Sequence, residues 1–126
     1  MPEKKTILVV EDDHFLSDIY KRQLEGKGCK VVVAGNGTEA LKVLKDLKPD
    51  VILLDLIMPG MNGFEFLEAL RAEADHKKRR VIVLSNLGQE SDKERCKTLG
   101  VKEYLVKTDV SVDQILSAVL GSSGYV

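Results

Sequence analysis

Residues 51–55 have the sequence Val-Ile-Leu-Leu-Asp, four consecutive apolar residues followed by an acid. Similar apolar runs occupy residues 7–10 (Ile-Leu-Val-Val), 31–34 (Val-Val-Val-Ala) and 81–84 (Val-Ile-Val-Leu), and a weaker run lies at 104–106 (Tyr-Leu-Val). Short runs rich in β-branched residues, with apolar side chains on both faces, are typical of the strands of a parallel sheet. The sequence therefore predicts five strands of this kind.

The segments between these runs carry apolar residues at the helical spacing of three and four. The expected helical stripes are Leu16, Ile19, Tyr20 and Leu24; Ala40, Leu41, Leu44 and Leu47; Phe64, Leu67 and Leu70; and Val112, Ile115, Leu116, Val119 and Leu120. Residues 89–99 form a weaker helical segment, with Cys96 and Leu99 as its apolar anchors. This alternation predicts an α/β fold, a (βα)₅ doubly wound parallel sheet between two layers of helices.

Length, charge and composition exclude several classes of protein. The 126 residues suit a single domain, and 44% of them are hydrophobic, enough to bury a core. Lysine and arginine total 19 against 20 acids, whereas a general phosphate clamp is basic, so we expect no direct contact with nucleic acid. The longest apolar run is far shorter than a membrane span, and Cys29 and Cys96 are expected to be free thiols. We therefore expect a cytoplasmic protein without membrane contact.

Charged and polar residues follow four of the five apolar runs. Glu11-Asp12-Asp13 follows the first run, Asp55 the third, Ser85 the fourth and Lys107 the fifth. Ligands of open parallel sheets bind at the carboxyl ends of the strands, and neighbouring strands lie about 4.8 Å apart. Crowded carboxylates need a compensating cation, and Mg²⁺ suits a small, partly hydrated oxygen site. The pattern indicates that Mg²⁺ and Lys107 hold a phosphoryl group, with Asp55 as the attacking carboxylate and Ser85 as a hydrogen-bond donor.

Each of these residues also has a simple structural explanation when it is taken alone. Asp13 is well placed as the N-cap of the first helix. A single Ser85 or Lys107 at the end of a strand carries little functional information. The argument rests on their conjunction, because four strand ends each supply a residue type that phosphoryl chemistry needs.

These residues resemble the receiver domain of two-component response regulators. The matching stretches are residues 7–13 (Ile-Leu-Val-Val-Glu-Asp-Asp), 50–63 (Asp-Val-Ile-Leu-Leu-Asp-Leu-Ile-Met-Pro-Gly-Met-Asn-Gly), 81–85 (Val-Ile-Val-Leu-Ser) and 104–107 (Tyr-Leu-Val-Lys). The resemblance implies the chemotaxis-type, flavodoxin-like fold with strand order 2-1-3-4-5. It further implies a single receiver domain over residues 1–126, with its core at about 5–120 and with 121–126 as a tail or truncated linker.

The resemblance also implies how the site works. Asp55 is implied as the phospho-acceptor, which takes a phosphoryl group from a phosphohistidine of a sensor histidine kinase or histidine phosphotransfer domain. The implied ligands of Mg²⁺ are Glu11, Asp12, Asp55 and the main-chain carbonyl of Ile57. Because the chain would assist only its own phosphorylation and slow dephosphorylation, we expect a signalling phosphoacceptor rather than an enzyme.

Three further residues have implied roles in the family. Lys107 pairs with the phosphoryl oxygens, and the Ser85 hydroxyl moves toward the phosphoryl group. Tyr104 matches the aromatic residue that rotates on activation. The switch is expected to change the face formed by the fourth helix, the fifth strand and the fifth helix, where an unknown downstream protein would bind. The protein is expected to be a monomer or a phosphorylation-dependent dimer.

The sequence departs from the family pattern at three places. Thr108 follows Lys107 where the family usually has proline, often through a cis bond; a cis bond without proline costs about 3–4 kcal/mol, so a trans peptide bond becomes possible there. Asn86 stands where a small residue usually follows the switch hydroxyl. Ile57 and Leu87 occupy two positions where polar groups in relatives help to orient a hydrolytic water. Since both are apolar, we expect a long-lived phosphoryl group.

The sequence argues against two other functions and leaves a third open. A flavin carrier of the same fold would need a phosphate loop rich in serine, threonine or glycine after the first strand, where Glu11-Asp12-Asp13 stands. An aspartyl-phosphate phosphohydrolase would have its nucleophile in a DxD motif, but position 57 is isoleucine. A receiver-like interaction module that is never phosphorylated stays as the alternative, because Thr108 and Asn86 depart from the family pattern.

Overall fold

The computed structural model describes residues 4–121, and in it the predicted strands form one parallel sheet. The strands are β1 (Thr6–Val10), β2 (Lys30–Ala34), β3 (Val51–Leu54), β4 (Val81–Ser85) and β5 (Glu103–Val106). Their order is β2-β1-β3-β4-β5, which confirms the order that the family resemblance implied. The register aligns Val10 with Leu54, so the next residues, Glu11 and Asp55, leave the sheet side by side.

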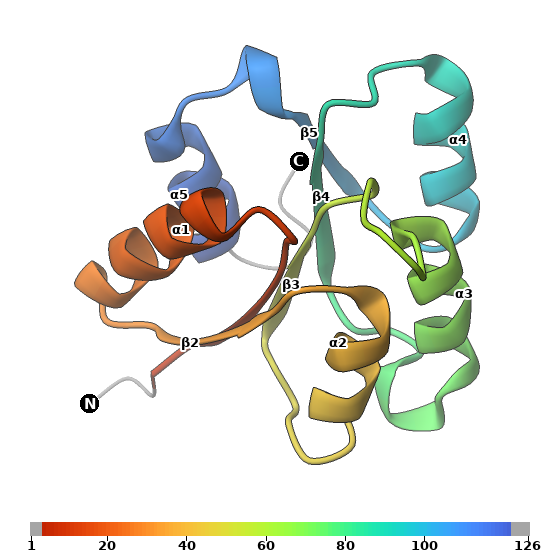
Figure 1. Cartoon of the computed structure of the whole chain (residues 1–126), viewed down its shortest axis with the longest axis horizontal. Coiled ribbons are helices and arrows are strands. Elements are labelled where there is room, and N and C mark those ends of the chain that lie inside the picture. The colour runs from red at the N-terminus through yellow and green to blue at the C-terminus, as the bar shows by residue number, and fades with distance from the viewer. Residues whose placement is uncertain (1–3, 122–126) are drawn as a thin grey trace.

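Helices cover both faces of the sheet, as Figure 1 shows. The helices are α1 (His14–Gly26), α2 (Gly37–Val43), α3 (Gly63–Ala72), α4 (Glu90–Thr98) and α5 (Val112–Leu120). α1 and α5 lie on one face, and α2, α3 and α4 lie on the other. The layers confirm the α/β/α sandwich that the alternating sequence pattern predicts. The predicted tail at 121–126 lies, beyond Gly121, outside the described residues.

Alternate residues of each strand belong to two separate apolar cores, because successive strand side chains point to opposite faces. Leu8, Val10, Ile52 and Leu54 pack with Phe66 and Leu67 of α3. Ile7, Val9 and Leu53 pack on the other face with Tyr20 and Leu24 of α1 and with Ile115 of α5. The central strands are therefore apolar on both faces, which is why their sequences are continuous apolar runs.

The second helix is shorter than its apolar stripe predicts. α2 ends at Val43, whereas the stripe extends to Leu44 and Leu47. The chain tightens after Val43, because Lys45 and Asp46 donate their main-chain N–H groups to acceptors three residues earlier. Leu44 nevertheless packs into the core from this turn. The pattern predicted the burial of this segment correctly and its helical length wrongly.

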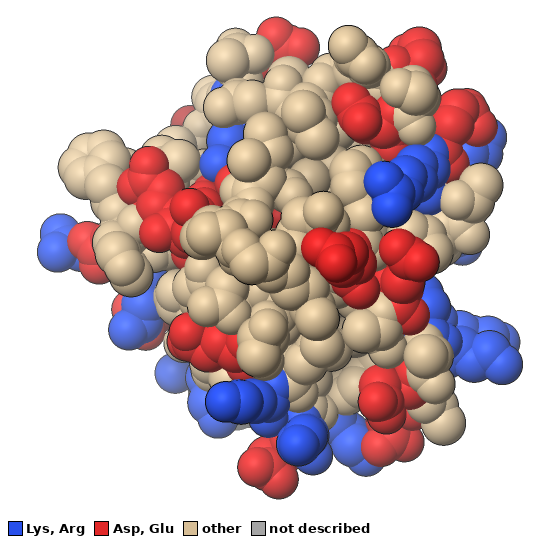
Figure 2. Space-filling model, turned by 45° about the vertical axis from the view of Figure 1, so that its right-hand side comes forward, with Lys and Arg blue, Asp and Glu red and all other residues tan. Residues whose placement is uncertain are grey.

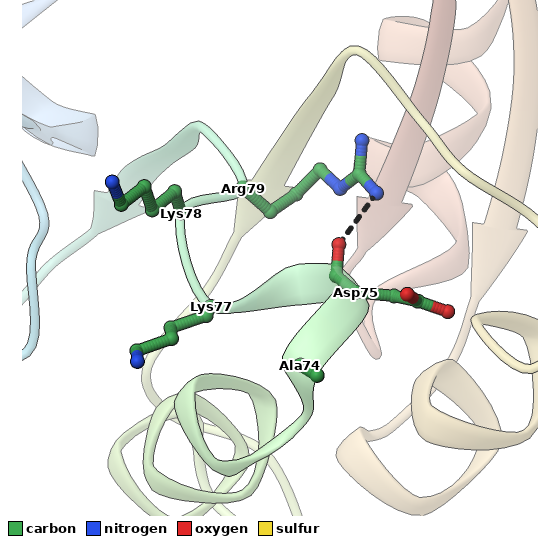
Figure 3. A pocket seen from close by; sticks show the side chains of 5 residues that line it. All are labelled: Ala74, Asp75, Lys77, Lys78 and Arg79. Atoms are coloured by element: carbon green, nitrogen blue, oxygen red, sulfur yellow. Dashed lines mark hydrogen bonds between the residues drawn. The ribbon is translucent and has the colours of Figure 1, made fainter.

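The basic run at residues 76–80 is more than a solvated loop. His76 is buried: its Nε2 lies 2.9 Å from the carbonyl of Leu44, and its Nδ1 accepts a 3.2 Å hydrogen bond from Arg79 Nε. Arg79 also donates to the carbonyl of Asp75, while Lys77 and Lys78 extend away from it (Figure 3). Only the two lysines of this run are exposed, and the other three residues bind the fold together.

The surface of the described residues carries charges of both signs. Figure 2 shows acidic and basic side chains spread over one face among uncharged residues. Within residues 4–121, no helix has the length and apolar character needed to cross a membrane.

Candidate functional site

Three carboxylates meet at the carboxyl ends of β1 and β3. One oxygen atom from each of Glu11, Asp12 and Asp55 lies within 4.8 Å of the others. Glu11 and Asp55 are buried, whereas Asp12 is exposed to solvent. The structure thus brings together the three acids that the sequence predicts at one edge of the sheet.

Lys107, directly after β5, provides the counter-charge of this cluster. Its Nζ lies 2.6 Å from Glu11 Oε1 and 3.0 Å from Asp55 Oδ2. The lysine side chain is 14% exposed and that of Glu11 is 3% exposed, so this ion pair is largely shielded from water. The direct contact between Glu11 and Lys107 was not predicted from the sequence, in which 96 positions separate them.

Burial and charge act together on the acidic cluster. Burial raises the pKa of Glu11 to about 7, an effect that the hydrogen bond from Lys107 opposes and the charge of Asp55 increases. Burial acts to lower the pKa of Lys107, but its hydrogen bonds to Glu11 and Asp55 outweigh this effect and raise the pKa. A cation at this site is therefore favoured by the carboxylates that surround it.

Asp13 lies one residue beyond the acidic pair and caps α1. Its side chain accepts hydrogen bonds from the main-chain N–H groups of Phe15, at 2.9 Å, and Leu16, at 3.2 Å. These bonds satisfy two of the free N–H groups at the start of the helix. The structure confirms the prediction that Asp13 is a cap, while Glu11 and Asp12 point into the cluster.

The loop after β3 is held close to Asp55 by main-chain hydrogen bonds. The N–H of Ile57 donates to Asp55 Oδ1 at 3.2 Å, and the N–H of Gly63 donates to the carbonyl of Leu56 at 2.9 Å. A Cβ atom at Gly63 would lie 2.6 Å from Leu56 Cα and 2.9 Å from the carbonyl of Asp55. Only glycine allows α3 to begin this close to the acid.

We expect Gly63→Ala to lower the free energy of unfolding by about 1–3 kcal/mol, because the added methyl group meets backbone that cannot move freely. Urea unfolding measures this loss. Gly26→Ala is the matched control, since a Cβ at Gly26 meets no atom within 4 Å. Its stability should equal or exceed that of the wild type. Equal losses in the two variants would contradict the packing argument.

Ser85 and Tyr104, the two expected switch residues, are linked through the main chain of Leu87. Ser85 is fully buried at the end of β4, and its Oγ accepts a 3.3 Å hydrogen bond from the N–H of Leu87. The Tyr104 hydroxyl donates to the carbonyl of the same residue, Leu87. Burial, with the negative charges nearby, raises the pKa of Tyr104 to about 12, so its hydroxyl keeps its proton and acts as a donor.

The peptide bond after Lys107 is trans, and threonine stands after the lysine where the family usually has proline. Between residues 4 and 121 no peptide bond is cis, so Lys107 and Thr108 are joined in trans. Lys107–Asp109 form a short 3₁₀ turn that leads toward α5. The trans bond agrees with the expectation drawn from threonine in place of proline.

Tyr20 is a further residue near the site that the sequence analysis placed only in a helical stripe. It is buried on α1, and it lines a small gap together with Glu11 and Asp55. Its polar tip among apolar stripe residues is the signal that could have singled it out, because a buried tyrosine hydroxyl usually meets a polar group.

Comparison with known protein families gives a match over nearly the whole chain. The response regulator receiver domain matches residues 7–120. The chain belongs to the receiver domain family. Accepting a phosphoryl group is the general function of receiver domains in signalling. Chemotaxis protein CheY4 of Vibrio cholerae matches this receiver domain with a TM-score of 0.87 at 28% identity, over 93% of this chain and 97% of that one.

Curated relatives of this receiver domain differ in length. Protein PilH of Pseudomonas aeruginosa is 37% identical over 103 residues, which cover 80% of this chain and 84% of PilH. The DNA-binding response regulator MtrA of Mycobacterium tuberculosis is 44% identical over 71 residues, which cover 56% of this chain. This chain spans about a third of the length of the MtrA relatives it matches. Since MtrA is DNA-binding by name, the expectation of no nucleic-acid contact has no support among the relatives.

Proposed function

We propose that this receiver domain takes a phosphoryl group from a phosphohistidine onto a carboxylate oxygen of Asp55. The oxygen attacks phosphorus, the P–N bond of the donor breaks, and the imidazole nitrogen leaves with the electron pair. An acyl phosphate on Asp55 results. The observation that carries this proposal is the contact of the Asp55 carboxylate with Lys107 inside a cluster of three acids.

We assign a Mg²⁺ site to Glu11, Asp12 and Asp55, with the main-chain carbonyl of Ile57 as a further ligand. Three carboxylates that offer oxygen atoms within 4.8 Å of one another fit a small, hard cation. Asp12 is exposed, so this side of the site is open to water, which Mg²⁺ retains in part. Mg²⁺ bound there would neutralise charge on the phosphoryl oxygens during transfer.

Lys107 pairs with the phosphoryl oxygens in this proposal. In the unphosphorylated protein its ammonium group donates hydrogen bonds to both Glu11 and Asp55. A phosphoryl group on Asp55 adds negative charge at this place and attracts the same ammonium group. Lys107 thereby supplies both the ground-state counter-charge and the charge that stabilises the transferred group.

The switch follows from the two hydrogen bonds at Leu87. When the Ser85 side chain rotates to carry its hydroxyl to the phosphoryl group, Oγ moves away from the N–H of Leu87, which loses its acceptor. Leu87 then shifts, and with it the carbonyl to which Tyr104 donates. Tyr104 belongs to β5 and Leu87 to the loop before α4, so phosphorylation reaches the face formed by α4, β5 and α5.

The proposed partners follow from this chemistry. The donor is a sensor histidine kinase or a histidine phosphotransfer domain, and the downstream protein binds the face formed by α4, β5 and α5. We assign residues 1–126 to a single receiver domain, which acts as a monomer or as a phosphorylation-dependent dimer. The same site hydrolyses its acyl phosphate slowly.

Intact mass after incubation with Mg²⁺ and acetyl phosphate tests the proposal. We expect the mass of one phosphoryl group to be added to the wild type and none to be added to Asp55→Asn, which keeps the shape of the side chain but lacks the nucleophilic carboxylate. An adduct on both proteins would overturn the assignment of Asp55. No adduct on either, with a phosphohistidine donor as well, would favour the interaction module that is never phosphorylated.

A further inference from the structure

The apolar contacts of α4 lie near one end of the helix. Among its nine residues only Cys96, close to the carboxyl end, is buried. Leu99 and Val101, which follow the helix, belong to the same apolar core. Glu90 and Ser91, at the amino end, are exposed. Apolar packing therefore fixes the carboxyl end of α4 and leaves its amino end on the surface.

Arg71, in the last turn of the neighbouring helix α3, holds the same end of α4 (Figure 1). Its Nε donates to the carbonyl of Leu99 at 2.8 Å, and its Nη2 donates to the carbonyl of Gly100 at 3.4 Å. Its Nη1 donates to the carbonyl of Arg79 at 2.8 Å, so the guanidinium is itself fixed to the segment before β4. One side chain thus joins the end of α4 to two other parts of the chain.

The amino end of α4 has weaker attachments. Gln89, its N-cap, makes no side-chain hydrogen bond, whereas side chains cap the other four α-helices within residues 4–121. Lys93 Nζ lies 6.0 Å from the centre of the Tyr104 ring, at the limit of a cation–π contact. The segment before the helix contains Leu87, which is bonded to Ser85 and Tyr104. The amino end therefore depends on hydrogen bonds that the proposed switch changes.

The two sides of α4 differ in the space that they leave. On the α3 side, the Arg95 guanidinium lies 4.1 Å from the centre of the Phe64 ring and 3.6 Å from the Glu68 carboxylate. On the β5 side, a cleft of about 540 Å³ has Lys93 and Tyr104 among its lining residues. The helix therefore has room to move toward β5, whereas Arg95 fills the space toward α3.

We propose that α4 pivots about its carboxyl end, where Arg71 holds it, and that phosphorylation moves its amino end toward β5. This inference rests on the proposed function, since the shift of Leu87 that starts the movement requires a phosphoryl group on Asp55. Nine helical residues span about 14 Å, so a tilt of about 10° displaces Glu90 by about 2 Å and leaves Leu99 in place. The cleft beside β5 narrows, which changes the face offered to the downstream protein. Arg71 is a positioning residue in this movement and does not touch the reacting atoms.

Hydrogen exchange of single amides, followed by NMR, tests the pivot. The probe is beryllium fluoride with Mg²⁺, a tetrahedral analogue of the phosphoryl group, compared with Mg²⁺ alone. The N–H of Lys93 is bonded to the carbonyl of Gln89, and the N–H of Val101 to that of Cys96. In the wild type we expect exchange at Lys93 to change by about fivefold and exchange at Val101 by less than about twofold. Equal changes at the two ends would show that the helix moves as a whole.

Arg71→Met removes the hydrogen bonds that hold the pivot. Beryllium fluoride should then change exchange at Val101 by about fivefold too, because the released end moves with the rest of the helix. The affinity for beryllium fluoride should stay within about twofold of the wild-type value, since Arg71 is at the end of α3 far from the acidic cluster. Arg95→Gln is the matched control: it removes a contact between the same two helices but leaves the pivot, so Val101 should respond as in the wild type.

A purely structural role for Arg71 gives a different result. Arg71→Met would then lose stability, but Val101 would still not respond to beryllium fluoride, and the pivot would be wrong. If Arg71→Met does not fold, Arg71→Lys replaces it, because lysine keeps the charge but cannot reach all three segments; the same response at Val101 is expected, and its absence again overturns the pivot. If the wild type binds no beryllium fluoride, the proposed function fails instead.

Discussion

Lys107→Met should lower the free energy of unfolding by about 3–5 kcal/mol in the absence of Mg²⁺, the typical effect of removing one partner from a buried ion pair. The side chains of Glu11 and Asp55 are 3% and 7% exposed, so neither carboxylate can regain full hydration when the lysine is lost. Methionine has nearly the length of the lysine stem, so the loss reflects charge and hydrogen bonds rather than packing.

The same substitution should slow the uptake of phosphoryl groups from acetyl phosphate by about 10²–10³-fold, as is typical for loss of a group aimed at developing charge. The substitution changes both stability and rate, because the same atom makes both sets of contacts. Nζ of Lys107 donates to the two carboxylates before transfer and would pair with the phosphoryl oxygens after it. Mg²⁺ should restore more stability to Lys107→Met than to the wild type, since two unpaired carboxylates then bind the ion without competition from the ammonium group.

Urea unfolding with and without Mg²⁺ measures the change in stability. In a separate experiment, intact mass recorded over time with acetyl phosphate measures the rate of phosphoryl uptake. Lys102→Met is the matched control, because Lys102 is exposed just before β5 and forms no ion pair within residues 4–121. Its unfolding free energy should lie within about 0.5 kcal/mol of the wild-type value. Equal stability of Lys107→Met and the wild type would mean that the ion pair contributes nothing to the fold.

The strands were predictable from the sequence because each obeys a local rule. Val51–Leu54 is apolar on both faces, and its burial on both sides of the sheet accounts for that pattern. Strand order is different, since nothing local determines which strands are neighbours. The strand order was predicted from the family resemblance. That order also predicted that Asp55 lies beside the first acidic pair.

The finer contacts of the site depend on tertiary geometry and could not be predicted. Glu11 and Lys107 are 96 positions apart, and their 2.6 Å contact depends on the length of both side chains and on the path of the chain after β5. The inward orientation of Arg79 also depends on carbonyl groups of distant segments, here that of Pro49 at 3.0 Å. Residue type alone indicates a charged surface at such positions, because a charged residue is usually exposed.

The two apolar residues at the rim of the site lead to the last prediction, a long-lived phosphoryl group. Ile57 is two residues beyond Asp55 and is 54% exposed. Leu87 is two residues beyond Ser85 and partly buried. Neither side chain can accept or donate a hydrogen bond, so neither can orient a water molecule for attack on phosphorus.

Ile57→Asn combined with Leu87→Glu should therefore shorten the lifetime of the phosphorylated protein by about 10²-fold, the usual contribution of a positioned acid–base group to a proton-transfer step. The decay is measured by intact mass after acetyl phosphate has been removed by desalting, with Mg²⁺ kept constant. Ile57→Val combined with Leu87→Met keeps both positions apolar and should decay at the wild-type rate. Decay of the Asn/Glu variant that is no faster than that of the Val/Met variant would show that access of water, rather than its orientation by side chains at these positions, limits hydrolysis.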